Sequence, residues 1–224
     1  MRKGVRRWRR LGSFWSTIGI LNMDGAQGYS KKKTEPQLEL TLRAVFGEGS
    51  YDRVCSLLRA TCPEEGYLEE FKEWERAYKR QDDQSSVLRF RENLLRSREG
   101  PAAEGQILKY VGRPDNRVQN PCQKCSTVYV AVDSNPLALI SALGFVLHFQ
   151  LIRRGRRFIT SEGYEIEVYR IERIVGNNPA QSVPVPGGVV EVCSVITPEK
   201  QTAPEDLINF ASFLTPTVTI PGVN

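Results

Sequence analysis

Apolar and polar residues alternate along several stretches of this chain, and that period restricts it to folds rich in β-structure. In Gln37–Phe46 every second side chain is apolar, from Leu38 to Phe46, and most of the positions between them are polar. Phe145–Leu151 repeats the pattern. A period of two residues is that of a strand with one buried face. Both segments therefore predict half-buried strands.

Other stretches predict strands because they are rich in β-branched and aromatic residues and end at turn residues. They are Val87–Leu94, Gln106–Gly112, Cys125–Val132, Gly163–Val175 and Gly188–Ile196. Within Gly163–Val175 the apolar face changes between Val168 and Tyr169, which indicates either a bulge or a strand buried on both sides. Arg154-Gly155-Arg156 predicts a turn after Leu151, and Asn177–Val185 predicts a loop.

Three helices are predicted among these strands. Ser50 is a suitable N-cap for a helix with an apolar stripe from Tyr51 to Leu58. Pro136 and Gly144 stand where a helix prefers to begin and to end. Thr202 and Glu205 have the spacing of a capping box before the last helix.

Gly66–Arg80 fits two structures. Its aromatic residues from Tyr67 to Tyr78 form a helical stripe, and the charged residues between them are good helix formers. Leu68, Trp74 and Tyr78 also share one strand face. Local preference favours the helix.

The predicted helices do not alternate regularly with the strands, so a parallel doubly wound sheet is not expected. Long antiparallel strands with few helices predict an open barrel or a strongly curved sheet. We expect the apolar strand faces to fill this barrel. Its edges and one groove would bind partner segments by strand addition or helix docking.

The net charge of +5 is unevenly distributed along the 224 residues. Residues 1–36 contain nine Lys/Arg and two acids, a net charge of +7, and subtracting this from +5 leaves −2 for residues 37–224. A nucleic-acid-binding domain usually presents a basic face of its own, so direct sequence-specific nucleic-acid binding is not expected. No stretch approaches the roughly 20 apolar residues of a membrane span.

Residues 1–36 are expected to form a basic, disordered extension before a single domain of residues 37–224. Met1–Asn22 is also rich in arginine and free of acids, as in a mitochondrial presequence. Its order of basic and apolar residues is that of a secretory signal, although no small-x-small site closes it. Lys31–Lys33 would serve as a weak nuclear import patch.

Residues suited to metal or nucleophile chemistry are few. Cys122 and Cys125 have the spacing of half a zinc site, but the sequence has no second pair of this kind. His148 is the only histidine, and it lies on the wetter face of its strand. Five scattered cysteines are typical of a reducing compartment such as the cytosol or nucleus. We expect no catalytic residue, cofactor or metal site.

The alternative enzyme hypothesis is a metal-dependent tunnel-type triphosphatase. Glu73-Trp74-Glu75 and Glu165-Ile166-Glu167 each put two carboxylates on one strand face, where they would bind a divalent metal. Arg89 and Arg91 would bind phosphate. The inward-facing lysines that such enzymes use are sparse in this sequence.

Four arginines flank the predicted turn after Leu151. They are Arg153, Arg154, Arg156 and Arg157. They would form a phosphate-binding patch, but a solvated hairpin tip or a contact to an acidic partner is favoured.

Taken in order, several short motifs resemble the family of subunit 18 of Mediator, the complex that links transcription activators to RNA polymerase II. They are Gln37–Ala60, Leu88–Arg91, Tyr110–Pro114, Leu139–Phe145, Arg154–Phe158, Val168–Ile174 and Glu205–Leu214. Each motif is weak alone, but the ordered set spans about residues 37–220.

This resemblance implies a mostly β protein, a closed antiparallel β-barrel with a few flanking helices. It implies a non-enzymatic nuclear subunit of the Mediator head module, with subunit 20 as direct barrel partner, a helix of subunit 8 as tether, and the RNA polymerase II machinery beyond them. It also implies a strand in the second half of Gly66–Arg80. We adopt that strand because tertiary context overrides local propensity.

Overall fold

The computed structural model describes residues 36–63, 67–83, 85–95, 106–115, 121–132, 136–176 and 178–222. Contacts divide the chain into Met1–Thr34 and Glu35–Asn224, and all described residues belong to the second unit. The predictions made for residues 1–35 lie outside the described residues.

Within these ranges the chain forms strands and helices in an order close to the predicted one. The strands are β1 (Gln37–Phe46), β2 (Tyr67–Arg80), β3 (Val87–Asn93), β4 (Gln106–Val111), β5 (Cys122–Ala131), β6 (Phe145–Ile159), β7 (Glu165–Ile174), β8 (Ser182–Pro184) and β9 (Gly188–Ile196). The helices are α2 (Tyr51–Thr61), α3 (Leu137–Ala142) and α4 (Pro204–Ser212). No helix in the described part of the chain is long and apolar enough to cross a membrane.

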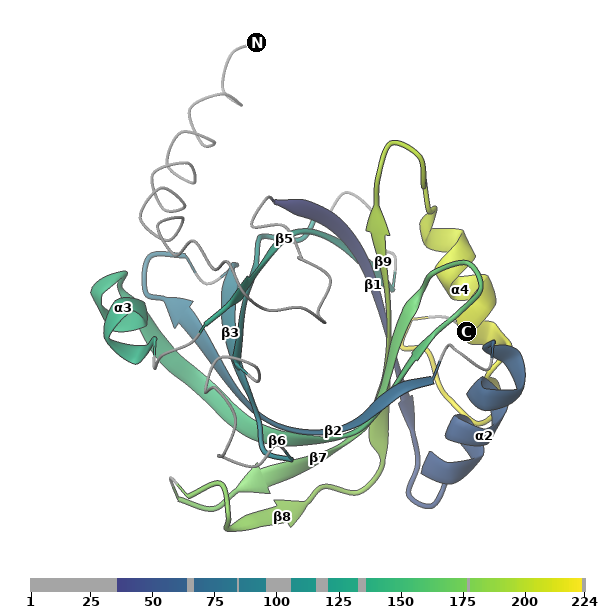
Figure 1. The fold of residues 1–224 in the computed structure, drawn as a ribbon, viewed down its shortest axis with the longest axis horizontal. Coiled ribbons are helices and arrows are strands. Elements are labelled where there is room, and N and C mark those ends of the chain that lie inside the picture. Colours follow the sequence, from purple (N-terminus) through teal and green to yellow (C-terminus); the bar gives the residue numbers. More distant parts are fainter. Residues whose placement is uncertain are drawn as a thin grey trace. The chain divides into compact units, whose positions relative to one another are not determined.

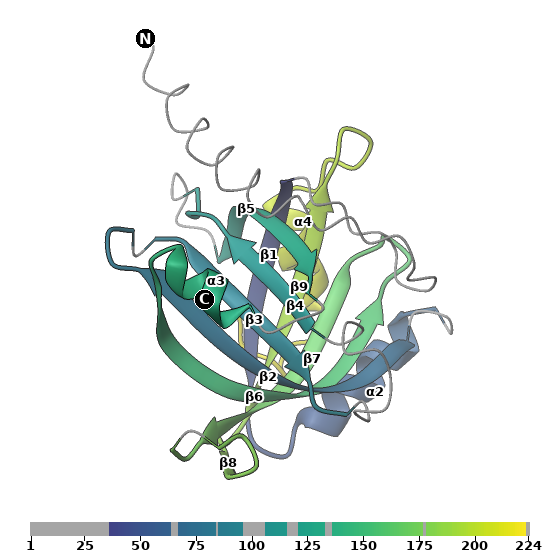
Figure 2. The ribbon, with the colours of Figure 1, turned by 60° about the vertical axis from the view of Figure 1, so that its left-hand side comes forward.

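Eight of these strands close into an antiparallel barrel. Hydrogen-bonded neighbours follow the order β6-β2-β3-β4-β5-β1-β9-β7, and β6 then pairs with β7 to complete the ring. Figure 1 looks into this ring, and Figure 2 shows how β2 and β6 extend along its wall. The short strand β8, which falls in the predicted loop, pairs with β7 outside the ring. The closed barrel confirms the predicted fold class.

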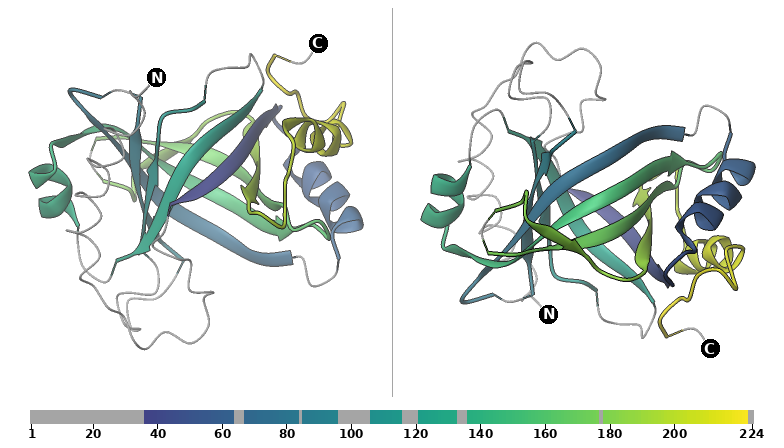
Figure 3. Two further views of the ribbon diagram at one scale, coloured as in Figure 1. Left: turned by 90° about the horizontal axis from the view of Figure 1, so that it is seen from above. Right: turned by 90° about the horizontal axis from the view of Figure 1, so that it is seen from below.

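The apolar core lies on the outer side of the barrel wall, under α2 and α4. Leu40 and Leu42 of β1 and Val190 and Val192 of β9 are each at most 1% exposed. The helices and the segment after α4 contribute the other half of this core, including Val54, Cys55, Leu58, Leu207, Ala211 and Leu214. Figure 3 shows both helices on one side of the barrel and α3 on the other. The expectation that apolar faces fill the barrel is therefore wrong, because those faces form its outer wall.

β1 and β7 are buried on both faces. In β1, Glu39 and Thr41 lie opposite the apolar face but are only 2% and 7% exposed, so the prediction of a half-buried strand is wrong. In β7, the outward-facing Val168 and the inward-facing Tyr169 are both buried. The pairing of β7 with β6 and β9 runs without a register shift. The change of apolar face in this segment therefore reflects burial on both sides rather than a bulge.

β2 occupies the whole of Tyr67–Arg80, which confirms the strand and overturns the local preference for a helix. It pairs with β6 from Tyr67 to Arg80 and with β3 from Glu73 to Tyr78. The backbone hydrogen bonds and packing of these two ladders stabilise the strand. This stabilisation exceeds the small helix propensity of the charged residues in β2.

The predicted turn at Arg154-Gly155-Arg156 is wrong. β6 continues to Ile159, and the chain reverses at Thr160–Tyr164, where the Thr160 N–H donates to the Tyr164 carbonyl at 3.1 Å. A Cβ atom at Gly155 would lie 1.9 Å from the carbonyl oxygen of Val168 on β7. Glycine is required here by the close approach of a neighbouring backbone rather than by a turn.

The first half of β6 differs from its predicted burial. Leu147 and Phe149 are 50% and 39% exposed, although alternation placed them on a buried face. β7 pairs with β6 only from Leu151 onward, so the earlier residues of β6 extend past that neighbour. A register shift opposite Ala77 and Tyr78 further disturbs the alternation.

The cap of α4 also differs from the predicted capping box. The Asp206 carboxylate accepts a hydrogen bond from the Ala203 N–H at 2.8 Å. The helix is thus capped by Ala203 and Asp206 rather than by Thr202 and Glu205. Thr202 instead shares a 2.8 Å hydrogen bond with Ser194 of β9.

Candidate functional site

The barrel interior is lined by charged side chains that occupy the polar positions of the alternating strands. Arg91 of β3 and Glu167 of β7 demonstrate the inward direction: Nη1 and Oε2 are 3.7 Å apart, although β2 and β6 separate these strands in the sheet. We call the set the interior cluster. It comprises five carboxylates and six cations: Glu39, Glu73, Glu75, Glu167, Glu191, Arg43, Arg89, Arg91, Lys109, Arg153 and Arg157.

Arg153 of β6 is the centre of the interior cluster, and its side chain is 2% exposed. Its Nη1 donates to Glu75 Oε2 at 3.3 Å, and its Nη2 donates to Glu167. Nη1 also lies 3.6 Å from Glu73 Oε2. The ring of Tyr169 lies against the guanidinium, with 4.0 Å between Cζ and the ring centroid. One buried cation therefore contacts three carboxylates from two strands.

Further arginines neutralise the same carboxylates. Arg91 Nε donates to Glu75 Oε2 at 2.8 Å, and Arg89 Nη1 donates to Glu75 Oε1 at 3.3 Å. Arg157 Nε donates to Glu167 Oε1 at 2.9 Å. Charge-assisted hydrogen bonds of this kind are stronger than neutral ones, and they join β2, β3, β6 and β7 from within.

A second group of contacts joins β1, β4 and β5. Lys109 Nζ donates to Glu39 Oε1 at 2.8 Å, reaching past β5. Tyr129 and Thr127 donate their hydroxyls to Glu39 Oε2 at 2.7 and 3.2 Å. The Thr41 hydroxyl also donates to Glu39 Oε1 at 3.1 Å, so Glu39, which is 2% exposed, accepts four hydrogen bonds. On β9, Glu191 accepts a 2.6 Å hydrogen bond from Arg43 Nε.

These contacts keep the buried carboxylates ionised. Burial alone would raise the pKa of Glu75, but Arg91, Arg89 and Arg153 lower that pKa to about 2. Burial likewise opposes ionisation of Glu167, yet Arg153 and its neighbours hold the pKa of this carboxyl well below its usual value. Burial raises the pKa of Glu39, but the charge and hydrogen bond of Lys109 and the hydrogen bond of Tyr129 together outweigh it, so the pKa is lowered.

Glu73, Glu75 and Glu167 are the residues best placed to hold a divalent metal in the interior. A hard cation requires free carboxylate oxygens. Glu73 Oε2 has no hydrogen-bond partner among the described residues, but all three carboxylates lie against the guanidinium of Arg153. Within the described ranges no three His, Cys, Asp or Glu side chains converge on a common point. Metal binding here would first require Arg153 to move away.

Three guanidinium nitrogens around Glu75 have no hydrogen-bond partner among the described residues. They are Nε of Arg89, Nη2 of Arg91 and Nε of Arg153. Buried N–H groups without partners are uncommon. Three arginines that contact one carboxylate and keep further N–H groups unpartnered supply donors that suit an oxyanion.

The structure brings together only part of the predicted triphosphatase site. Glu73 and Glu75 point inward from β2, and Glu167 joins them from β7. Glu165 lies at the exposed end of β7 and does not belong to the interior cluster. The predicted phosphate ligands Arg89 and Arg91 also point inward, but both are paired with Glu75.

The remaining predicted candidates are separated from one another. Cys122 and Cys125 both lie in β5, and three positions along a strand put them on opposite faces. Cys122 donates to the Pro204 carbonyl at 3.4 Å on the outer wall, while Cys125 shares the inner face with Thr127. His148 is exposed on β6, 5.6 Å from the ring of Phe149.

The four arginines do not form the expected solvated hairpin tip, because β6 continues through them to Ile159. They are distributed over both faces of this strand. Arg153 and Arg157 point inward, and Arg154 and Arg156 point outward.

Sequence reasoning missed Arg153, Lys109, Glu39 and Glu191 as members of an interior site. Their signal was the alternation itself, since each occupies a polar position of a strand, but those positions were assigned to solvent. Lysines are sparse in the interior as expected, with Lys109 the one lysine in the cluster; five arginines supply the other cations.

The comparisons with known proteins bear on the fold. No protein-family model matches this sequence, and no curated protein matches it. A chain of the Schizosaccharomyces pombe Mediator head module superposes with a TM-score of 0.60 at 13% identity, covering 80% of this chain and 93% of that chain.

Two other solved structures share the barrel. A putative adenylyl cyclase from Hippeastrum, described as having a dominant triphosphatase activity, gives a TM-score of 0.52 at 13% identity and covers 83% of this chain and 92% of its own. The PH1819 protein of Pyrococcus horikoshii OT3 gives 0.53 at 16% identity, with 83% and 91% covered. The barrel fold is therefore common to a Mediator head chain and to a triphosphatase.

Proposed function

We propose that this protein is a non-enzymatic subunit of a Mediator head module, of the subunit 18 kind. Residues 37–224 form its barrel domain, and residues 1–36 form a basic extension. It regulates RNA polymerase II transcription in the nucleus through protein contacts, with subunits 20 and 8 as its direct partners.

The observation that carries the non-enzymatic role is the position of Arg153. Its guanidinium occupies the space between Glu75 and Glu167, the carboxylates that a catalytic metal would need. The buried charges have fixed partners of opposite charge in place of water, so the interior side chains hold the strands together rather than bind a ligand. Partner binding then falls to the outer surface.

Two further observations support the Mediator assignment. The ordered motifs from Gln37 to Leu214 resemble subunit 18 along nearly the whole domain. The head-module chain of Schizosaccharomyces pombe has the same barrel over 93% of its length.

The test is affinity purification of the full chain from nuclear extract through a C-terminal tag, with mass spectrometry of the bound proteins. We expect Mediator subunits 8 and 20 among them in near-stoichiometric amounts, and nuclear fluorescence of the tagged protein. A protein that is excluded from the nucleus and recovers no Mediator subunit would contradict the proposal.

A tunnel-type triphosphatase is the second candidate. The observation that favours it is the set of free guanidinium N–H groups on Arg89, Arg91 and Arg153 around Glu75. If an oxyanion such as a triphosphate binds these groups and Arg153 moves, Glu73, Glu75 and Glu167 are the carboxylates that would hold its metal ion.

This candidate is tested by phosphate release from inorganic triphosphate with Mg²⁺ or Mn²⁺. Activity that is lost in Glu73→Gln with Glu75→Gln and retained in Glu165→Gln would favour the enzyme over the scaffold. The control is matched because Glu165 lies on the same strand face as Glu167 but outside the interior cluster.

A further inference from the structure

Three cations stand side by side on the outer face of β2, β6 and β7. Lys72 is the direct partner of Arg154 in the β2–β6 ladder, and Arg154 is the direct partner of Arg170 in the β6–β7 ladder. Their chain neighbours Arg153 and Tyr169 point into the barrel, so these three side chains point outward. We call them the cationic row. Adjacent strands lie about 4.8 Å apart, so the row spans roughly 10 Å.

The row is electrostatically unfavourable for folding alone, because like charges directly opposite each other destabilise a sheet. Arg154 and Arg170 are exposed, and within the described ranges neither has an acidic side chain within ion-pair distance. Lys72 Nζ reaches Glu172 only at 3.9 Å. In the interior cluster, by contrast, every cation has a carboxylate. The unbalanced row therefore indicates a surface that meets its counter-charges in another molecule.

The residues on either side of the row indicate the direction in which a bound segment would run relative to the strands. Along the strands its neighbours include acids: Glu70 pairs with Arg156 at 2.8 Å on one side, and Glu172 accepts a hydrogen bond from Ser182 at 2.6 Å on the other. A negatively charged segment that followed β2 or β7 would meet one of these acids. A segment that crosses them meets three cations in succession.

The chemistry favours an acidic protein segment over a nucleic acid. A duplex or single strand gains its affinity from a broad basic surface, whereas residues 37–224 carry a net charge of −2. The row is three residues wide, with Glu70 at one border and Glu172 at the other. Next to it, the Arg170 guanidinium lies 4.5 Å from the centroid of the Tyr51 ring on α2, which adds an aromatic border that a side chain can pack against.

We propose that the cationic row docks an acidic segment of a partner protein, laid across β2, β6 and β7 beside α2. The inference deepens the proposed function, since it assigns a contact surface to a protein that acts through partners.

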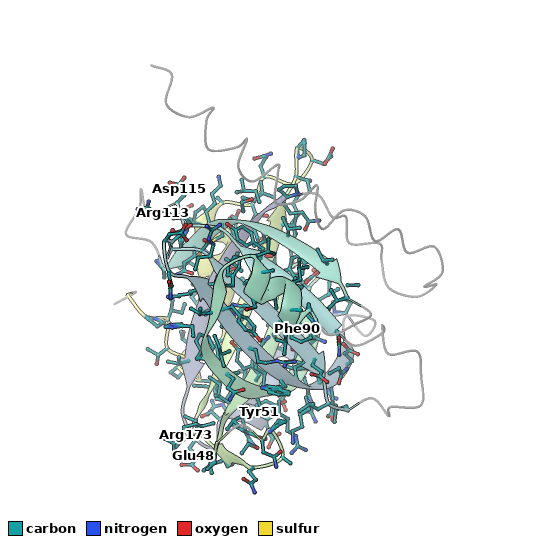
Figure 4. The ribbon with its side chains drawn as sticks, turned by 90° about the vertical axis from the view of Figure 1, so that its left-hand side faces the viewer. Glu48, Tyr51, Phe90, Arg113, Asp115 and Arg173 are labelled. Atoms are coloured by element: carbon teal, nitrogen blue, oxygen red, sulfur yellow. The ribbon has the colours of Figure 1, made fainter. Side chains whose placement is uncertain are left out.

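The test measures fluorescence anisotropy of a labelled Glu-rich peptide and of its Glu-to-Gln counterpart with the full chain. We expect binding of the Glu-rich peptide that weakens with salt. Arg154→Glu with Arg170→Glu should reduce that affinity by about tenfold or more. Arg113→Glu is the matched control, because Arg113 is exposed and follows β4, which does not neighbour β2, β6 or β7. Figure 4 shows Arg113 well apart from Tyr51, and the substitution should change affinity less than about twofold.

Lys31→Gln, Lys32→Gln and Lys33→Gln together report on the basic extension. The inference is overturned if affinity is lost in this variant and kept in the row variant, if the Glu-rich peptide does not bind, or if a single-stranded oligonucleotide of equal charge binds more tightly through the row. The melting temperature of the row variant verifies that it is folded. Recovery of Mediator subunits is measured separately. If the peptide binds through the cationic row but no Mediator subunit is recovered, the Mediator assignment is contradicted and the docking surface is not.

Discussion

The barrel interior and the layer under α2 and α4 are made of alternate residues of the same strands, yet different forces hold them. On β1, Glu39 faces inward and accepts hydrogen bonds from Lys109, Tyr129 and Thr127. Its neighbour Leu40 faces outward into an apolar core and is 1% exposed. The first region depends on paired charges and the second on removal of hydrocarbon from water.

The wall of this barrel needs both regions. The helices bury the outer apolar faces, so the barrel has a core without filling its centre with hydrocarbon. The centre is then free to hold polar side chains, provided that each charge finds a partner. Substitutions in the two regions should differ in size, in pH dependence and in sign.

The largest effect is expected from Arg153→Met, which keeps most of the side-chain length and removes the charge. Glu75 and Glu167 would remain buried with less compensation, and removal of one partner from a buried ion pair costs about 3–5 kcal/mol. Urea unfolding at pH 7 measures this change in the free energy of unfolding. Arg154→Met, one residue along and facing outward, is the control and should show no loss; a loss below about 1 kcal/mol for Arg153→Met would contradict the account.

Leu42→Ala tests the outer apolar layer on β1. Leu42 is 0% exposed, and truncation leaves a cavity as well as lost burial, so we expect a loss of about 3 kcal/mol that is the same at pH 7 and pH 4. Val45→Ala on the same strand is the control, since Val45 is 45% exposed. Equal losses for the two variants would show that the layer under the helices is not the core.

Acid should weaken the interior and spare the apolar layer. The pKa of Glu75 is about 2 in the folded protein and near 4.5 in the unfolded chain, so the unfolded chain takes up the proton first as the pH falls. Its stabilisation is complete above about pH 5 and is lost toward pH 2, by about 2.5 kcal/mol at pH 2.5 for this residue alone. Unfolding free energies from pH 7 to pH 2.5 measure the loss, and Glu75→Gln should show a shallower slope.

The smallest effect has the opposite sign. Arg154→Gln removes the middle charge of the cationic row, and relief of repulsion from Lys72 and Arg170 should stabilise the protein by about 0.2–1 kcal/mol at low salt. The gain should shrink as salt screens the row. A destabilisation of 1 kcal/mol or more in urea unfolding would mean that Arg154 has a structural partner.

Local preference favoured a helix at β2, a turn at Gly155 within β6 and a loop at β8. The sequence nevertheless predicts β1 and the start of β6 from period-two alternation, and β3, β4, β5, β7 and β9 from their residue content. It identified Glu73 and Glu75 as a pair on one face and Arg89 and Arg91 as another. It could not identify the sidedness of the barrel, since alternation separates two faces without saying which one points inward. Gln37–Phe46 illustrates this: its polar face resembled a solvated surface and is in fact the interior.

Arg153 could not be predicted as the centre of the site for a related reason. Its role depends on the register that brings Glu73 of β2 opposite it and on β7 closing the ring, and both are set by long-range pairing. Gly155 misled in the same segment, because a glycine between arginines resembles a turn. The structure shows why glycine is required at this position: a Cβ atom would lie 1.9 Å from the Val168 carbonyl oxygen.

The interior charges serve one another rather than a ligand. Thermal unfolding of the full chain tests this most directly, with and without Mg²⁺ and inorganic triphosphate at about 1 mM each, the upper end of common KM values. A ligand that binds the folded state raises the melting temperature. We expect that the ligands leave the melting temperature of the wild type unchanged, and that of Glu73→Gln with Glu75→Gln likewise. A rise of several degrees in the wild type that is absent in the double variant would contradict it.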